Sequence, residues 1–179
     1  EGLVSRTAIE WTDHTVNPIR ARLNGRVGHH CVKVSAGCAN CYSSRLQVRF
    51  GMPPFEVGKR QDVETFFDDA RLRNVLARKK PTRFFWCDMT DLFGEWVPDE
   101  WIDRCFAVMA LTPQHTHQVL TKRPERMRAY VTAAGRKQAV VGHWPGFGEP
   151  DQDLRWWPLP NVWLGVSVED QPSADARVP

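Results

Sequence analysis

The most constraining feature of this sequence is the alternation of strand signals with helix signals along its 179 residues. The run RFFWC at residues 83–87 is apolar on both faces, which is typical of a central strand in a parallel sheet. Strands that alternate with helices predict an α/β fold with a parallel sheet. The predicted strands are residues 15–21, 83–87, 117–121 and 161–168.

Helices are predicted where apolar residues recur at helical spacing. Ile102, Cys105 and Phe106 share one such face, and Pro98 suits the first turn of that helix. About four βα units result, half of the eight that close a (β/α) barrel. We therefore expect a single α/β domain over residues 1–179 that forms a partial barrel. The predicted helices are residues 40–50, 68–79, 98–111, 124–133 and 171–178.

One long segment breaks this alternation. Residues 135–160 contain four glycines, four prolines and three tryptophans without clear periodicity. We expect an irregular insertion that is packed by its aromatic side chains. The sequence also lacks an initiator methionine and stops as the fourth helix begins, so we expect a processed chain or a fragment of a larger barrel.

Composition and charge restrict the class of protein. No apolar run approaches the roughly 20 residues that cross a bilayer, and no secretory signal opens the sequence, so a cytoplasmic location without membrane contact is expected. The net charge of +3 permits contact with nucleic acid but gives only a weak electrostatic footprint. Basic side chains form two clusters, which we interpret either as solvated faces or as nucleic-acid contacts. The clusters are Arg20, Arg22, Arg26 and Lys33, and Lys122, Arg123, Arg126 and Arg128.

Three of the five cysteines, Cys31, Cys38 and Cys41, lie within eleven residues, a density that indicates a metal centre. A structural zinc site closes with four protein ligands, whereas three thiolates leave one position open. A [4Fe-4S] cluster held by three thiolates would likewise leave one iron free for a small molecule. Gly37 allows a close turn, and Cys41 is expected in a first helical turn, where thiolate is favoured.

Other interpretations of the cysteine run stay open. A zinc ion could be completed by His29 or His30. The three cysteines could also be unrelated buried residues. Cys87, on an apolar strand, and Cys105, on an apolar helix face, are predicted to be core residues. No P-loop, dinucleotide fingerprint or serine-nucleophile elbow in the sequence indicates another class of enzyme.

Polar residues follow three of the predicted strands, at the edge where parallel sheets place their ligands. Lys122 and Arg123 are expected to meet a carboxylate or phosphate of the substrate. Helix capping and solvation are the alternative roles for such residues. The first strand adds three candidates for the barrel floor or mouth: Trp11, Asp13 and Asn17. The candidates at the other strand ends are Asp88, Thr90, Asp91, Lys122, Arg123, Ser167 and Glu169.

Four long blocks carry a family resemblance. They are IEWTDHTVNP, KVSAGCANCY, DMTDLFGEWVPDEWIDRCFAVMALTPQHTHQVLTKRPERM and NVWLGVSVEDQ, and they span most of the chain. These blocks resemble the phage Gp37/Gp68 family (DUF5131-type), a group of radical-SAM-like proteins of phages and bacteria. The resemblance implies a partial (β/α) barrel of the radical SAM type, with a [4Fe-4S] cluster on the loop after the first strand. It also implies a phage- or bacterium-encoded cytoplasmic protein.

The resemblance also implies roles for particular residues. The three clustered cysteines would each bind an iron, and the fourth iron would chelate S-adenosyl-L-methionine (SAM), whose cleavage yields a 5′-deoxyadenosyl radical. The spacing here is C-x6-C-x2-C instead of the common C-x3-C-x2-C, and the aromatic Tyr42 follows the third cysteine instead of preceding it. An extra segment, RARLNGRVGHH, precedes the first cysteine. Tyr42 is expected against the adenine of SAM, and Ser167 and Glu169 are expected near its ribose.

Three hypotheses for function follow. The first is a radical-SAM-like iron–sulfur protein that takes an electron from a donor and modifies a nucleic acid or nucleotide. The second is a zinc-stabilised nucleic-acid-binding module, which metal analysis would distinguish from the first. The third is a truncated, non-catalytic partner protein, which a reading frame that closes at Pro179 would favour.

Overall fold

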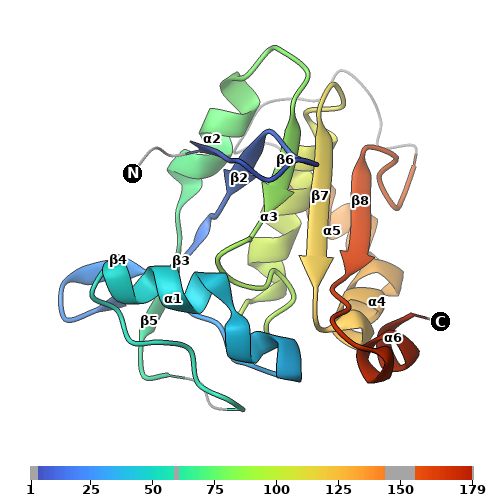
Figure 1. Cartoon of the computed structure of the whole chain (residues 1–179). Coiled ribbons are helices and arrows are strands. Elements are labelled where there is room, and N and C mark those ends of the chain that lie inside the picture. The colour runs from blue at the N-terminus through green and yellow to red at the C-terminus, as the bar shows by residue number, and fades with distance from the viewer. Residues whose placement is uncertain (1–3, 59–60, 144–155, 179) are drawn as a thin grey trace.

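The chain folds around two β-sheets (Figure 1). The computed structural model describes residues 4–58, 61–143 and 156–178. The larger sheet has the strand order β1-β2-β6-β7-β8, in which β2, β6, β7 and β8 are parallel and β1 is antiparallel. The predicted α/β fold with a parallel sheet is therefore confirmed. The strands are β1 (Ser5–Arg6), β2 (His14–Val16), β6 (Arg83–Trp86), β7 (Thr116–Thr121) and β8 (Val162–Val166).

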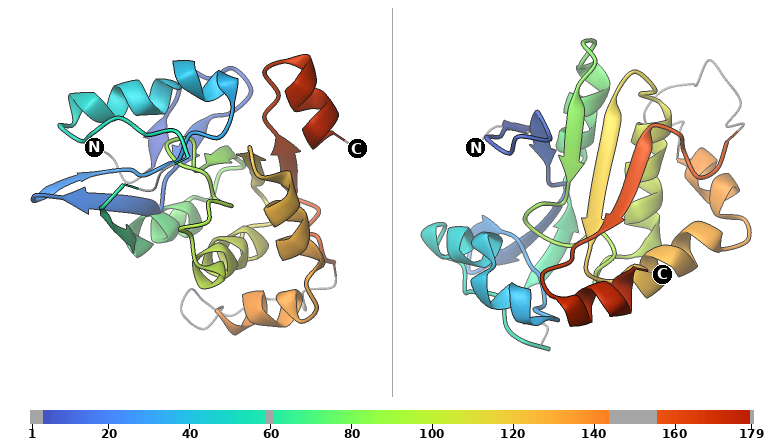
Figure 2. Two further views of the ribbon diagram at one scale, coloured as in Figure 1. Left: turned by 90° about the horizontal axis from the view of Figure 1, so that it is seen from below. Right: turned by 45° about the vertical axis from the view of Figure 1, so that its right-hand side comes forward.

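A layer of helices covers one face of this sheet (Figure 2). Successive strand residues point to opposite faces, so Phe84, Trp86 and Val119 face the helices and are fully buried. They pack against the apolar side of α3, where Ile102 and Phe106 are also fully buried, as the helical spacing predicts. The helices of this layer are α2 (Asp69–Ala77), α3 (Asp99–Ala110), α4 (Pro124–Thr132) and α5 (Arg136–Gly142).

The second sheet is small and antiparallel, with the order β4-β3-β5. The extra segment before the cysteines forms its hairpin, in which Asn24 and Gly25 both have positive φ, 49° and 75°. Asn-Gly is a strong hairpin signal because both residues tolerate this conformation. The strands are β3 (Ile19–Leu23), β4 (Arg26–Gly28) and β5 (Glu64–Phe67), and the prediction missed β4 and β5.

The prediction of one continuous first strand over residues 15–21 is wrong. This segment forms two strands, β2 and β3, which belong to different sheets. Pro18 lies at the break and has no N–H to donate to a ladder. The side chain of Asn17 accepts from the Met89 backbone N–H at 3.0 Å and thereby fixes the point where the chain leaves the larger sheet.

The segment with the cysteines leads from the small sheet into a helix. The predicted helix over residues 40–50 is divided into a 3₁₀ turn, η1 (Ala36–Asn40), and α1 (Tyr42–Arg49). Cys41 is the N-cap of α1, directly before the first helical turn in which it is expected. The final helix, α6 (Gln171–Arg177), matches its prediction within one residue.

The segment 135–160 is more regular at its start than predicted. It begins with α5, in which Val140 is fully buried. Trp157 packs against Phe106 with ring centroids 5.4 Å apart and donates its indole N–H to the Val131 carbonyl. Residues 144–155 lie outside the described residues. In the described part of the chain, no helix is both long and apolar enough to span a bilayer.

A buried histidine links the sheet to α3. His117 is fully buried and accepts from the Trp86 indole N–H at Nδ1, 3.0 Å away. Its Nε2 donates to the Thr112 hydroxyl oxygen, because that hydroxyl donates to the Val108 carbonyl. Burial, together with the neighbouring His115, lowers the pKa of His117 to about 3. This side chain is therefore neutral in the folded protein.

This network predicts a loss of stability in acid. A histidine with a folded pKa of about 3 and an ordinary value of 6.5 stabilises the fold above pH 6.5 and loses that contribution as the pH falls toward 3. Between pH 7 and pH 5, His117 is expected to cost about 2 kcal/mol of the free energy of unfolding. Urea unfolding of the parent and of His117→Gln at both pH values measures this. Equal pH dependence in the two proteins would contradict the prediction.

Candidate functional site

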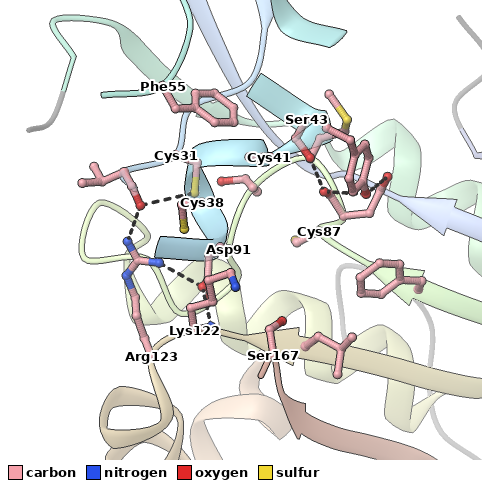
Figure 3. A pocket seen from close by; sticks show the side chains of 18 of the residues that line it. Cys31, Cys38, Cys41, Ser43, Phe55, Cys87, Asp91, Lys122, Arg123 and Ser167 are labelled. Carbon is pink, nitrogen blue, oxygen red and sulfur yellow. Dashed lines mark hydrogen bonds and ion pairs between the residues drawn. The ribbon is translucent and has the colours of Figure 1, made fainter. Parts of the chain in front are cut away.

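A cavity of about 480 Å³ lies at the carboxyl ends of the parallel strands (Figure 3). One wall is the segment that carries the cysteines, and the other is the larger sheet with the loops that follow β6 and β7. Ten of the eleven candidates among the clustered cysteines, Tyr42 and the residues after the later strands line it, and Glu169 is the exception. The ten are Cys31, Cys38, Cys41, Tyr42, Asp88, Thr90, Asp91, Lys122, Arg123 and Ser167. Of the three first-strand candidates, Trp11 also lines it.

The three clustered cysteines share one wall of this cavity (Figure 3). Cys31 follows the small sheet, Cys38 is buried on η1, and Cys41 caps α1. All three side chains line the same cavity, so the fold brings the residues of the C-x6-C-x2-C run to one place.

The thiols differ in their electrostatic surroundings. Burial, helped by the nearby Asp91 carboxylate, raises the pKa of Cys31 to about 12. Burial acts in the same direction on Cys38, but hydrogen bonds from the Val34 backbone and from Ser35 outweigh it and lower the pKa of Cys38 below its ordinary value. Cys31 is thus a neutral thiol, and a bound cation would have to displace its proton.

Among the described residues, no group of three or more His, Cys, Asp or Glu side chains is placed so that it could hold a metal ion. The metal centre indicated by the cysteine spacing therefore stays a prediction. His29 and His30 are not in the cavity lining. His29 donates its Nδ1–H to the Ile19 carbonyl, and the His30 ring packs against Trp96.

A buried ion pair fixes the cysteine segment to the sheet. The Arg123 guanidinium lies 2.9 Å from the Asp91 carboxylate, and both side chains are over 90% buried. Arg123 also donates to the carbonyl of Val32, the residue after Cys31, at 3.1 Å. Its remaining nitrogen binds Glu95, and its plane lies over the Trp96 ring. Arg123 therefore positions the cysteine wall, while its predicted contact with substrate stays a prediction.

Glu169 holds the cysteine segment at a second point, near Ser35. The Glu169 carboxylate accepts from Lys122 Nζ at 2.7 Å and from the Ser35 hydroxyl. Burial opposes its ionisation, but these hydrogen bonds lower the pKa of Glu169 to about 2. A Cβ at Gly37 would lie 2.6 Å from Glu169 Cγ, so any larger residue there would force the Glu169 side chain to move.

Asp88 forms a third polar cluster on the cavity wall. It accepts from the Asn17 amide and from the Tyr42 hydroxyl, the latter at 3.0 Å, and its backbone carbonyl accepts from Ser43. Burial raises the pKa of Asp88, although the hydrogen bonds from Asn17 and Tyr42 act against it. Asn17 thus reaches the rim, whereas Asp13 binds Arg83 in a different pocket, at the start of β6.

The apolar part of the cavity was not predicted from the sequence. It is lined by Phe85, Leu120, Phe55 and Cys87, and Cys87 is also buried in the core. Phe85 and Leu120 lie on strands, and only the register of the sheet shows which face of the sheet they occupy. Cys87 has a φ of 60°, a conformation that non-glycine residues rarely adopt and that sequence patterns do not reveal. Cys105 is a fully buried core residue, as predicted.

The Arg123 network predicts a large and specific stability effect. Arg123→Ala leaves the buried Asp91 carboxylate unpaired, and we expect a loss of about 3–5 kcal/mol in the free energy of unfolding. Arg123→Lys should not restore it, because an ammonium cannot make the planar set of contacts. Chemical unfolding measures both variants.

A matched control is Arg22→Ala, which removes an exposed ion pair with Glu64. We expect this change to cost about 0–1 kcal/mol. Similar losses in Arg22→Ala and Arg123→Ala would contradict the role assigned to the buried pair.

Comparison with known proteins finds one family. The family DUF5131, described as a protein of unknown function, matches residues 6–179. The match includes the cysteine segment and every predicted site residue. No curated protein and no solved structure matches the chain.

Proposed function

The chain belongs to the DUF5131 family, and we propose that it is an iron–sulfur protein of the radical SAM type that acts on a nucleic acid or nucleotide. The observation that carries this proposal is the shared cavity wall of Cys31, Cys38 and Cys41. Three thiolates would hold a [4Fe-4S] cluster and leave one iron open toward the cavity. The four parallel strands agree with a partial (β/α) barrel, and the sequence resemblance to the phage Gp37/Gp68 family supports the radical SAM assignment.

The chain's own residues suit the binding of SAM beside the cysteines. When bound, the cluster would supply the electron that cleaves SAM reductively, after an electron donor has reduced it. Asp88 and the Tyr42 hydroxyl line the cavity next to Cys41 and offer polar atoms to an amine or a ribose. Ser167 lines the opposite wall. The Arg123 and Glu169 contacts hold the cysteine segment in place, so a ligand would find this wall already ordered.

The cavity also suits chemistry that must exclude water. Part of its lining is apolar and includes Phe55, Phe85, Met89 and Leu120. Such a lining keeps solvent from a reactive species and orients a substrate at the same time. A zinc-stabilised module would need a fourth protein ligand beside the cysteines, and neither His29 nor His30 reaches the cavity. The two histidines considered for a zinc site are therefore not placed to complete it.

Anaerobic reconstitution with iron and sulfide tests the proposal. We expect about four irons per chain in the parent, a visible absorbance, and SAM binding by equilibrium dialysis. Cys31→Ala, Cys38→Ala and Cys41→Ala should each lose most of the iron and the SAM binding. Cys105→Ala is the matched control, since Cys105 is buried on α3 away from the cavity, and it should keep both.

Two outcomes would overturn the assignment. One is a Cys31→Ala variant that binds iron, sulfide and SAM like the parent. The other is one zinc per purified chain with no iron and no visible absorbance, which would favour the zinc-stabilised module.

A further inference from the structure

We propose that a basic pocket between the β1–β2 loop and the start of β6 binds a phosphate group, of a free nucleotide or of a nucleic-acid strand, through Arg6, Arg78 and Lys80. The charges and the geometry of the pocket support the phosphate site directly. Its link to the reaction rests on the proposed function and deepens it, because the pocket would hold the phosphate of the substrate beside the cysteine cavity.

The basic pocket is a cavity of about 700 Å³ at the amino ends of β2 and β6, the opposite end of the sheet from α1 (Figure 1). Two segments that are distant in sequence form it: the chain from β1 into β2, and the chain from the end of α2 into β6. A volume of this size is typical of pockets that bind whole small molecules. The lining residues are 6–10, 12–14, 78 and 80–83.

The lining of the basic pocket carries an excess of positive charge. It has four cationic side chains and two carboxylates, and one of each is paired, because Arg83 lies 2.9 Å from Asp13. The other three cations face one carboxylate, Glu10, and form no ion pair in the described part of the chain. An excess of two positive charges remains, which matches the charge of about −1.5 to −2 on a phosphomonoester at pH 7. The three cations are Arg6, Arg78 and Lys80.

His14 shows that cations from both segments act at the same place. Arg6 stands directly opposite His14 in the antiparallel pair of β1 and β2, so their side chains share one face. Burial lowers the pKa of His14, and the positive charges of Arg78 and Arg6 lower it further, while Asp13 raises it. The potential at this wall of the pocket therefore has contributions from two arginines that are far apart in sequence.

The backbone that carries the three cations is fixed by contacts of its own. Arg6 belongs to β1 and is held by the strand pairing. Arg78 is the C-cap of α2, and its carbonyl accepts a hydrogen bond from His115 at 3.0 Å. The Thr82 hydroxyl donates to the Lys80 carbonyl at 2.8 Å. A ligand therefore does not have to order the backbone of the pocket when it binds.

The types of side chain favour phosphate over a carboxylate. A guanidinium presents a planar fork of N–H donors that matches two phosphate oxygens, and a lysine adds a point charge. Arg6 and Lys80 are exposed and Arg78 is half-buried, so a ligand in the pocket can reach all three. A single carboxylate carries one negative charge and would leave part of the positive charge uncompensated.

The basic pocket adjoins the cysteine cavity. Ile9 lines both, Trp11 lines the cysteine cavity, and Thr12 lines the basic pocket. Only a short stretch of the β1–β2 loop therefore separates the two spaces. Phosphate contacts fix the register and orientation of a nucleic acid on a protein. A phosphate held in the basic pocket would thus direct the adjoining part of the same ligand toward the cysteine cavity.

Fluorescence anisotropy with a labelled single-stranded 12-mer of mixed sequence, as DNA and as RNA, tests the inference on the whole chain. We expect saturable binding that weakens about tenfold in the triple variant Arg6→Gln/Arg78→Gln/Lys80→Gln. The plot of log Kd against log salt should also become shallower by about 2, since each phosphate contact with a single strand contributes about 0.7 to its slope. A folded triple variant with the affinity and salt dependence of the parent overturns the inference.

Calorimetric titration with nucleoside 5′-monophosphates, and with the same nucleosides without phosphate, distinguishes the two sources of the phosphate. Monophosphate binding that the triple variant loses supports the site with a free nucleotide as ligand. Binding of the 12-mer alone, weakened in the triple variant, supports the site with a strand as ligand. Nucleosides that bind as tightly as their monophosphates overturn the inference, as does a parent that binds neither monophosphates nor 12-mers.

The matched control is Arg49→Gln/Arg73→Gln/Arg128→Gln, which removes the same charge from exposed arginines that line neither cavity. Its binding should stay within about twofold of the parent, because distant exposed charges are screened. Equal weakening in the two triple variants would indicate general attraction of a polyanion and overturns the inference.

Circular dichroism and the thermal midpoint show whether each variant is folded. If the pocket variant with three substitutions is unfolded, Lys80→Gln, which changes one exposed side chain, replaces it. About threefold weaker binding is then expected. A folded Lys80→Gln protein that binds like the parent overturns the inference.

The two proposals can fail separately. A parent protein that binds iron and SAM but neither the 12-mers nor the monophosphates overturns the phosphate site and leaves the proposed function standing. A parent that binds no iron but binds a phosphate ligand through the three cations overturns the proposed function and supports the phosphate site. The pocket variant should retain the iron and SAM binding of the parent.

Discussion

The buried ion pair between Arg123 and Asp91 is the interaction on which the site depends. Its two charges are removed from water, a cost that is offset only when every hydrogen bond is made. Asp91 accepts from the Thr121 hydroxyl and from two backbone N–H groups in addition to Arg123. Arg123 in turn reaches the carbonyl of Val32. The pair therefore joins the loops that follow β6 and β7 to the cysteine segment, which the sequence places about 60 residues before the nearer of the two loops.

The two sheets contribute different parts of the cavity around this ion pair. The larger sheet supplies a rigid floor of apolar residues and the polar strand ends. The cysteine segment follows the small sheet and lies against these residues of the larger sheet. It is held there a second time by Glu169, which accepts from Lys122 and from Ser35. The cavity is therefore lined by the thiols of the cysteine segment and by aromatic side chains such as Trp11 and Phe85.

Much of this architecture could be predicted from the sequence. The run at 83–87 is apolar enough to mark a central strand, and the alternation of elements predicts the strand at 117–121. The rule that ligands lie at strand ends selects Asp88 and Ser167, and both line the cavity. The split first strand could not be read from hydrophobicity, because the residues on both sides of Pro18 are equally suited to strands. The face that Phe85 occupies depends on register, which is a tertiary property. The role of Arg123 is set by contacts that are distant in sequence.

The residues that line the cavity are far apart in sequence, and this links ligand binding to the stability of the fold. Trp11, Cys31, Asp88 and Ser167 line one space but come from segments spread over nearly the whole chain. No unfolded chain holds them together, so a molecule that contacts all of these segments at once can bind only the folded state. Occupancy would then stabilise the fold by mass action, by about 2.7 kcal/mol when the ligand is present at a hundred times its dissociation constant. The melting temperature of this protein is therefore a direct and general reporter of what the cavity accepts.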